Sequence, residues 1–229
     1  MKYTRSESDH EVTLSPREPA TASVILLHGL GADGWDLLPV AQALDLPDSL
    51  PVRFVLPHAP VRAVTVSGGY AMRAWFDVRD ITPEDRVDPE GLDEATRRVT
   101  GYLRSEQERG IPASRIVLAG FSQGGALALH AGLRHAERLA GIVALSTFLP
   151  FPDALAAERS SANAAAPILM CHGLEDSIVP VGFGRQASRF LVDAGHPLAW
   201  HEYPMDHEIC AAEVAEISGW LRERLGSRL

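Results

Sequence analysis

One stretch decides the fold, and it reads Ile116-Val117-Leu118-Ala119-Gly120-Phe121-Ser122-Gln123-Gly124-Gly125-Ala126. An apolar strand breaks into Gly-x-Ser-x-Gly, and a helix rich in alanine and leucine follows. A serine in a strained turn between strand and helix needs flanking residues without side chains. The turn also opens a helix, whose unpaired backbone N–H groups favour a developing negative charge. The pattern predicts a nucleophile elbow that exposes Ser122; the alternative is a glycine-rich helix start with an inert serine.

Strands and helices alternate on either side of this stretch. Further strands are expected at 24–27, 52–56, 142–145, 168–171 and 198–200, with an antiparallel edge at 11–14. Helical periodicity is found at 35–44, 91–109, 124–134, 181–194 and 208–225. Near-continuous apolar strands that alternate with helices predict an α/β fold, with a mainly parallel sheet covered on both faces.

Two segments break the alternation. Residues 57–89 contain prolines, glycines and aromatics with little periodicity, which predicts a long excursion over the surface. Residues 151–167 contain an alanine run and predict a helix and loop around the sheet edge.

Length and composition limit the class of protein. A chain of 229 residues with 46% hydrophobic content is expected to form one domain over residues 1–229. The net charge of −9 argues against nucleic acid or an anionic membrane as the main partner. No apolar run is long enough to span a bilayer, so a soluble, cytoplasmic protein is expected. Cys171 and Cys210 have no zinc-site spacing and are interpreted as buried small hydrophobes rather than a disulfide pair.

A serine nucleophile needs a histidine that accepts its proton. Functional groups of open parallel sheets collect beyond the carboxyl ends of strands, and His207 follows the last predicted strand. That strand continues from 198–200 to Glu202, so His201 lies within it and His196 precedes it, and neither meets this criterion. The alternative for His207 is a surface histidine that caps the next helix.

A carboxylate must hold the imidazole in the right tautomer, and in this elbow type it lies between the serine and the histidine in chain order. Asp176 fits because it follows the strand at 168–171 and precedes Pro180 at the next helix start. Glu175 is the competitor one position away. Asp206 is adjacent to His207, and neighbours in sequence usually diverge too much to pair. Serine, aspartate and histidine thus occur in the order that an α/β-hydrolase fold requires.

The second half of an oxyanion hole is expected after an early strand. His28-Gly29-Leu30-Gly31-Ala32 follows the strand at 24–27, and the backbone N–H of Leu30 is the expected donor beside that of Gln123. The rival interpretation is a phosphate-binding loop, but no Lys-Ser or Lys-Thr follows and the Gly-x-Gly-x-x-Gly spacing is missing.

Taken together, the motifs resemble the phospholipase/carboxylesterase family of α/β-hydrolases, which includes bacterial carboxylesterases and acyl-protein thioesterases. The resemblance covers residues 23–225 and rests on Leu27-His28-Gly29-Leu30-Gly31-Ala32, Pro57-His58-Ala59-Pro60, Trp75-Phe76-Asp77, Gly120-Phe121-Ser122-Gln123-Gly124-Gly125, Asp176-Ser177-Ile178-Val179-Pro180 and Met205-Asp206-His207-Glu208. It implies an α/β-hydrolase without a large lid that cleaves esters or thioesters of short to medium acyl chains. It also implies that no cofactor is needed and that the chain is a possible homodimer.

By position, the resemblance makes Ser122, Asp176 and His207 the triad and Leu30 and Gln123 the oxyanion donors. It also places Trp75 at the substrate cleft, and Phe148 is a plausible second wall, although each aromatic residue can instead be plain core. Phe76 and Phe148 stand where tyrosine is common, which favours apolar ligand groups. The expected activity is that of a serine carboxylesterase. The alternatives are an acyl-protein thioesterase or lysophospholipase and, from another class, a non-catalytic ligand-binding homologue.

Overall fold

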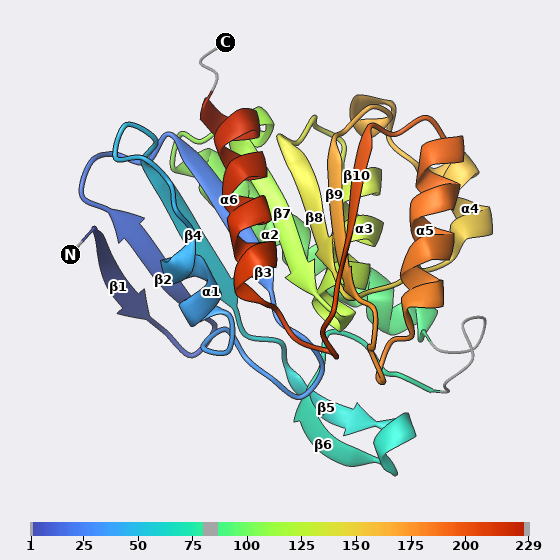
Figure 1. Cartoon of the computed structure of the whole chain (residues 1–229). Coiled ribbons are helices and arrows are strands. Elements are labelled where there is room, and N and C mark those ends of the chain that lie inside the picture. Colours follow the sequence, from blue (N-terminus) through green and yellow to red (C-terminus); the bar gives the residue numbers. More distant parts are fainter. Residues whose placement is uncertain (1, 80–86, 227–229) are drawn as a thin grey trace.

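The computed structural model describes residues 2–79 and 87–226, which contain a sheet of eight strands (Figure 1). The strands in spatial order are β1 (Tyr3–Glu7), β2 (Glu11–Pro16), β4 (Val52–Pro57), β3 (Ala22–Leu27), β7 (Ile116–Phe121), β8 (Gly141–Leu145), β9 (Ile168–Gly173) and β10 (Leu198–Tyr203). All neighbours from β4 to β10 pair in parallel, whereas β1 and β2 are antiparallel. The mainly parallel sheet predicted from the sequence is therefore confirmed.

Helices cover both faces of the sheet. They are α1 (Leu38–Ala43), α2 (Pro89–Glu108), α3 (Gln123–Arg134), α4 (Pro152–Glu158), α5 (Val181–Asp193) and α6 (Ala211–Gly226). Because side chains alternate along a strand, Val24 and Leu26 of β3 face α1 and α6, and Ile25 and Leu27 face α2 and α3. Each face thus has its own apolar core, and the strands between them are buried on both sides, as their sequences indicated.

The structure changes or adds detail to three predicted features. The polar amino-terminal segment forms β1, so the strand predicted at 11–14 is the second strand of the sheet and not its edge. The excursion at 57–89 contains the hairpin of β5 (Val61–Val64) and β6 (Tyr70–Arg73), and its residues 80–86 lie outside the described residues. The helix in 151–167 packs Leu155 into the core on the α3 face.

The two cysteines are free, and only Cys171 is buried; Cys210 is half-buried just before α6, so the interpretation as a buried hydrophobe was wrong for it. In the part of the chain that the structure describes, no helix is both long enough and apolar enough to cross a bilayer.

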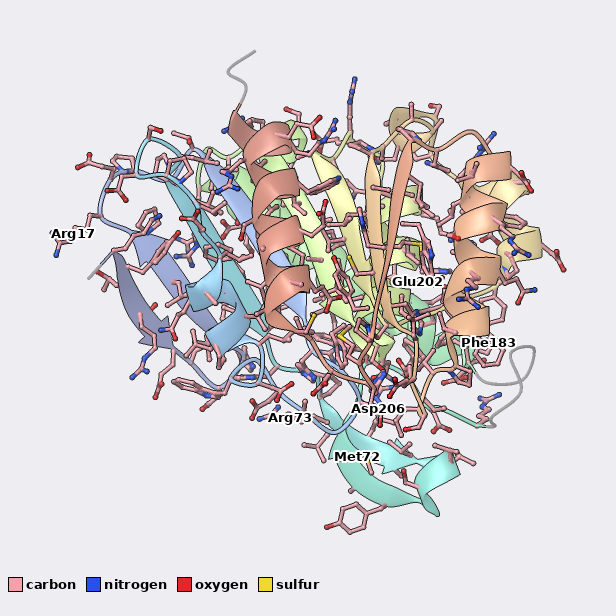
Figure 2. All side chains as sticks on the ribbon, in the orientation of Figure 1. Arg17, Met72, Arg73, Phe183, Glu202 and Asp206 are labelled. Carbon is pink, nitrogen blue, oxygen red and sulfur yellow. The ribbon has the colours of Figure 1, made fainter. Side chains whose placement is uncertain are left out.

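The parallel strands bring the ends of four chain segments together. The carboxyl ends of β7, β8, β9 and β10 lie at the same edge of the sheet, where the β5–β6 hairpin also projects (Figure 1). Figure 2 shows Met72, Asp206 and Phe183 at this end of the molecule. This is the edge at which open α/β sheets bind ligands.

Candidate active site

Ser122 lies in the tight turn between β7 and α3. Its backbone has φ 53° and ψ −119°, a conformation that costs about 1–3 kcal/mol for a residue with a side chain. Surrounding hydrogen bonds hold it there: its N–H donates to the carbonyl of Leu145 at 2.8 Å, and its own carbonyl accepts from the Thr147 hydroxyl at 2.7 Å. Strand β8 and the segment after it thus maintain the strained geometry of the turn at Ser122.

Glycine is required on both sides of the serine because backbone segments meet there. A Cβ atom on Gly120 would lie 2.2 Å from the carbonyl oxygen of Gly124, and one on Gly124 would lie 2.2 Å from that of Leu27. These distances are far below van der Waals contact. The two glycines therefore allow α3 to begin directly against β7 and β3.

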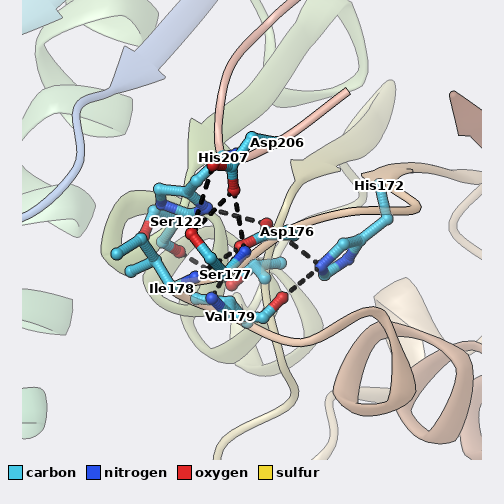
Figure 3. Close-up of polar contacts among 9 residues, drawn as sticks. Ser122, His172, Asp176, Ser177, Ile178, Val179, Asp206 and His207 are labelled. Atoms are coloured by element: carbon cyan, nitrogen blue, oxygen red, sulfur yellow. Dashed lines mark hydrogen bonds and ion pairs between the residues drawn. The ribbon is translucent and has the colours of Figure 1, made fainter. Parts of the chain in front are cut away.

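The structure brings Asp176 and His207 together next to this turn (Figure 3). The Nδ1 atom of His207 lies 2.8 Å from Oδ2 of Asp176, and the histidine ring packs on Phe121 with ring centroids 4.7 Å apart. Because Phe121 precedes Ser122, the imidazole lies beside the serine. With a proton on Nδ1 donated to the carboxylate, Nε2 is left as the basic atom.

Of the two candidate carboxylates after β9, the fold buries Asp176. It is 6% exposed, and its Oδ1 accepts the backbone N–H groups of Ile178 at 3.0 Å and Val179 at 2.7 Å. Glu175, the competing residue, is exposed. The turn that follows β9 therefore presents Asp176 inward with its orientation fixed at both oxygens.

Asp206 binds backbone N–H groups and not the His207 ring. Its Oδ1 accepts the backbone N–H groups of Ser177 and His207, both at 2.8 Å, and these bonds, that of Ser177 first, lower the pKa of Asp206. This carboxylate therefore links the loop after β9 to the loop after β10. The sequence reasoning missed this function, and only its position before His207 could have indicated it.

The expected oxyanion donors lie in adjoining turns. A Cβ atom built on Gly29 would be 3.5 Å from Cβ of Ser122, so the loop after β3 reaches the serine. Gly31 N–H donates to the carbonyl of Arg73 at 2.8 Å. Within the described residues, no carbonyl accepts from the backbone N–H of Leu30 or of Gln123, which opens α3. Both groups are therefore available to a ligand.

A buried polar network holds these turns, and sequence reasoning left it unassigned. The Gln123 side chain accepts the Trp75 N–H at 2.9 Å and donates to the Phe76 carbonyl at 2.8 Å. The Trp75 indole donates to the carbonyl of His28 at 2.9 Å, and Nε2 of His28 accepts the Ala59 N–H at 3.0 Å. Burial lowers the pKa of His28 to about 4, which keeps its ring neutral and suited to that acceptor role.

The two expected substrate-binding aromatics occupy different environments. Trp75 is fully buried, so it supports the loop at His28 and does not form a wall open to substrate; the expectation for Trp75 is corrected by its burial. Phe148, half-buried after β8, lines a pocket of about 440 Å³ between α4 and α5. The rings of Phe151, Phe183 and Phe190 line the same pocket.

A comparison with protein families identifies the family of this chain. Residues 8–225 match the model of the phospholipase/carboxylesterase family. The chain belongs to this family. It is therefore a serine ester hydrolase with the α/β-hydrolase fold, as the resemblance of its motifs had implied.

Relatives of this family member include thioesterases and esterases. Acyl-protein thioesterase 1 of Cryptococcus neoformans is 38% identical over 230 residues, which cover 93% of this chain and 96% of that protein. The crystal structure of Zea mays acyl-protein thioesterase 2 has a TM-score of 0.84 and 29% identity, covering 94% of this chain and 99% of that one. The crystal structure of esterase PE8 has a TM-score of 0.80 and 31% identity, covering 98% and 100%.

Proposed function

We propose that the protein is a carboxylesterase that cleaves short- to medium-chain acyl esters through a Ser122–His207–Asp176 triad and an acyl-enzyme. One observation carries this proposal: His207 is hydrogen-bonded through Nδ1 to buried Asp176 while its ring lies beside the elbow that presents Ser122. This is the arrangement that converts a weakly nucleophilic hydroxyl into an attacking group.

The reaction follows from the atoms that face the serine. Nε2 of His207 takes the Ser122 hydroxyl proton as Oγ attacks the ester carbonyl, and Asp176 stabilises the imidazolium that forms. The imidazolium returns that proton to the leaving alkoxide, which departs as the alcohol. A water molecule then attacks the acyl-enzyme as the same histidine takes its proton, and the return of that proton to Oγ releases the acid and free Ser122.

The negative oxygen of the tetrahedral intermediate would bind the N–H groups of Leu30 and Gln123. Both are backbone donors in turns fixed by buried hydrogen bonds, so they need little reorganisation during the reaction. The apolar pocket next to Phe148 would hold the acyl group, because its lining of phenyl rings favours hydrocarbon over charged groups.

Two serines at opposite ends of β7 give the direct test. We expect Ser122→Ala to lower kcat/KM for p-nitrophenyl butyrate by roughly 10⁴–10⁶-fold with an unchanged thermal midpoint, because only the nucleophile is lost. Ser114→Ala, at the exposed turn before β7, is the control and should keep wild-type activity. Hydrolysis by Ser122→Ala at the wild-type rate would rule out the proposed nucleophile.

An acyl-protein thioesterase or lysophospholipase is the second candidate, favoured by the 38% identity to the Cryptococcus neoformans protein. Measuring kcat/KM over a series of acyl lengths, with oxygen esters and thioesters of the same acids side by side, separates the candidates. A maximum of kcat/KM at short to medium esters supports the carboxylesterase. A maximum at long-chain thioesters or at lysophospholipids supports the second candidate instead. Failure of a fluorophosphonate probe to label Ser122 would indicate a non-catalytic homologue.

The remaining sequence expectations stay predictions: a cytoplasmic location, a single domain, a homodimer, and no nucleic-acid partner. Size-exclusion chromatography with light scattering tests the dimer directly.

A further inference from the structure

A second histidine lies against the carboxylate of Asp176. His172, near the end of β9, is fully buried, and its Nε2 is 2.7 Å from the carbonyl oxygen of Val179 and 3.4 Å from Oδ2 of Asp176. Figure 3 shows His172 and His207 approaching Asp176 from different sides. Neither the motifs nor the proposed triad gives His172 a function.

The protonation of His172 follows from its partners. A carbonyl oxygen only accepts hydrogen bonds, so Nε2 carries the proton that is donated to Val179. Its other ring nitrogen, Nδ1, is buried with no partner among the described residues. Burial lowers the pKa of His172 against the opposing effects of the Val179 carbonyl and Asp176, so the ring is a neutral donor with a fixed tautomer.

Helix α5 and strand β10 pack against the His172 ring and restrict its orientation. A Cβ atom on Gly184 of α5 would lie 2.3 Å from Nδ1 of His172, and the ring of Trp200 lies 6.0 Å from the imidazole between centroids. Trp200 is itself fixed, because its indole N–H donates to Glu202 at 2.9 Å, and Glu202 forms a two-point ion pair with Arg185. Helix α5 and strand β10 thus hold His172 against the turn that carries Asp176.

We propose that His172 is a positioning residue that acts on the triad through Val179 and Asp176. Val179 is held at both polar groups: its N–H donates to Oδ1 of Asp176 at 2.7 Å, and its carbonyl accepts from His172. Two hydrogen bonds and the 3.4 Å approach of His172 Nε2 to Oδ2 of Asp176 thus link the three residues and fix the plane of the carboxylate. His207 is hydrogen-bonded to Oδ2 of the same carboxylate, so the orientation of its imidazole depends on the plane of that carboxylate.

This inference rests on the proposed function, and it predicts a loss in kcat without a change in KM. A carboxylate that is displaced leaves His207 less often in the reactive orientation, whereas neither Asp176 nor His172 lines the pocket beside Phe148. Misplacement of a catalytic group by about 1 Å typically costs on the order of 10²-fold in rate. A histidine that only fills the core would instead change stability and leave kcat per folded molecule unaltered.

Three substitutions of His172 distinguish these roles. His172→Gln puts an amide donor near the position of Nε2, His172→Asn puts one near Nδ1, and His172→Leu has no donor. We expect roughly a 10- to 100-fold lower kcat for His172→Leu and His172→Asn, with unchanged KM and partial recovery in His172→Gln. Rates are normalised to folded protein measured by circular dichroism. Wild-type kcat in His172→Leu, or equal rates in the three variants, would overturn the proposal.

A matched pair of glycines in α5 tests the same inference without touching His172. Gly184→Ala must displace the His172 ring or Trp200, whereas Gly182→Ala, two residues earlier, adds its methyl group to open space. We expect a lower kcat and slower fluorophosphonate labelling of Ser122 in Gly184→Ala only. Identical kinetics in the two glycine variants would overturn the proposal even if the His172 variants do not fold.

The Ser122→Ala measurement separates failure of this inference from failure of the proposed function. If Ser122 is required but the His172 and Gly184 variants retain wild-type kcat, the positioning role is wrong and the triad stands. If Ser122→Ala remains active, both are overturned.

Discussion

At the scale of single residues, Gln123 combines two functions in one position. Its backbone N–H begins α3 without an acceptor among the described residues, and its side chain holds Trp75 and Phe76 through two hydrogen bonds in a fully buried region. The amide is required because one atom must accept and the other must donate; a carboxylate or an aliphatic chain fails at one or both. The residue thus joins the elbow to the segment that follows the β5–β6 hairpin.

We predict that Gln123→Met lowers the free energy of unfolding, because it leaves the Trp75 N–H and the Phe76 carbonyl buried without partners, at about 1–3 kcal/mol each. Urea unfolding monitored by tryptophan fluorescence measures the change. Gln107→Met, which removes only an exposed hydrogen bond from half-buried Gln107 of α2 to Glu137, is the control and should change the free energy by less than about 0.5 kcal/mol. Equal urea midpoints for the two variants would contradict the prediction.

At the scale of elements, the same substitution should act in opposite directions in two helices. Gly124→Ala in α3 would place a methyl group 2.2 Å from the carbonyl oxygen of Leu27 and is expected to destabilise the protein by about 1–3 kcal/mol. Gly101→Ala in α2 adds a methyl group in open space and is expected to stabilise it by about 0.5–1 kcal/mol. Thermal unfolding gives both signs, and a stabilised Gly124→Ala would exclude the close approach of α3 to β3.

Elements that lie within the two-sided core could be predicted from the sequence because burial dictates their composition. The strands at 116–118 and 168–171 were expected and lie inside β7 and β9. Strand β1 was missed because an exposed edge strand needs no apolar pattern, and its residues Tyr3–Glu7 are mostly polar and exposed. The β5–β6 hairpin was missed for the same reason, since Val61 and Tyr70 are exposed.

The candidate site could be predicted where the chemistry requires a residue type, but not where packing brings a residue into contact. Ser122, Asp176 and His207 follow strands whose ends must converge, so their order in the chain was informative. By contrast, His172 lies one residue after Cys171 in a buried strand, and nothing local shows that its ring reaches Val179. Such contacts depend on how α5 and β10 pack, which short-range sequence patterns do not encode.

At the scale of the whole molecule, one buried carboxyl group couples stability to pH. Glu213, in the first turn of α6, is fully buried against the sheet near Cys171 and Tyr203. Burial raises the pKa of Glu213 to about 8, and the backbone of Cys210 offsets this only in part. The carboxyl group is therefore protonated in the folded protein at neutral pH, whereas in the unfolded chain it ionises near its ordinary value of 4.5.

The sign of the effect follows from the proton count. Between about pH 4.5 and pH 8 the folded state binds a proton that the unfolded state releases, so rising pH favours unfolding by roughly 1.4 kcal/mol per unit from this group. We predict that Glu213→Gln removes this slope and is more stable than wild type at pH 7–8, measured by urea unfolding over a pH series. Glu223→Gln, at an exposed position in the last turns of α6, should retain the wild-type slope. If Glu213→Gln and wild type lose stability in parallel across this pH range, the slope does not come from Glu213. Glu213 is then not the neutral buried acid.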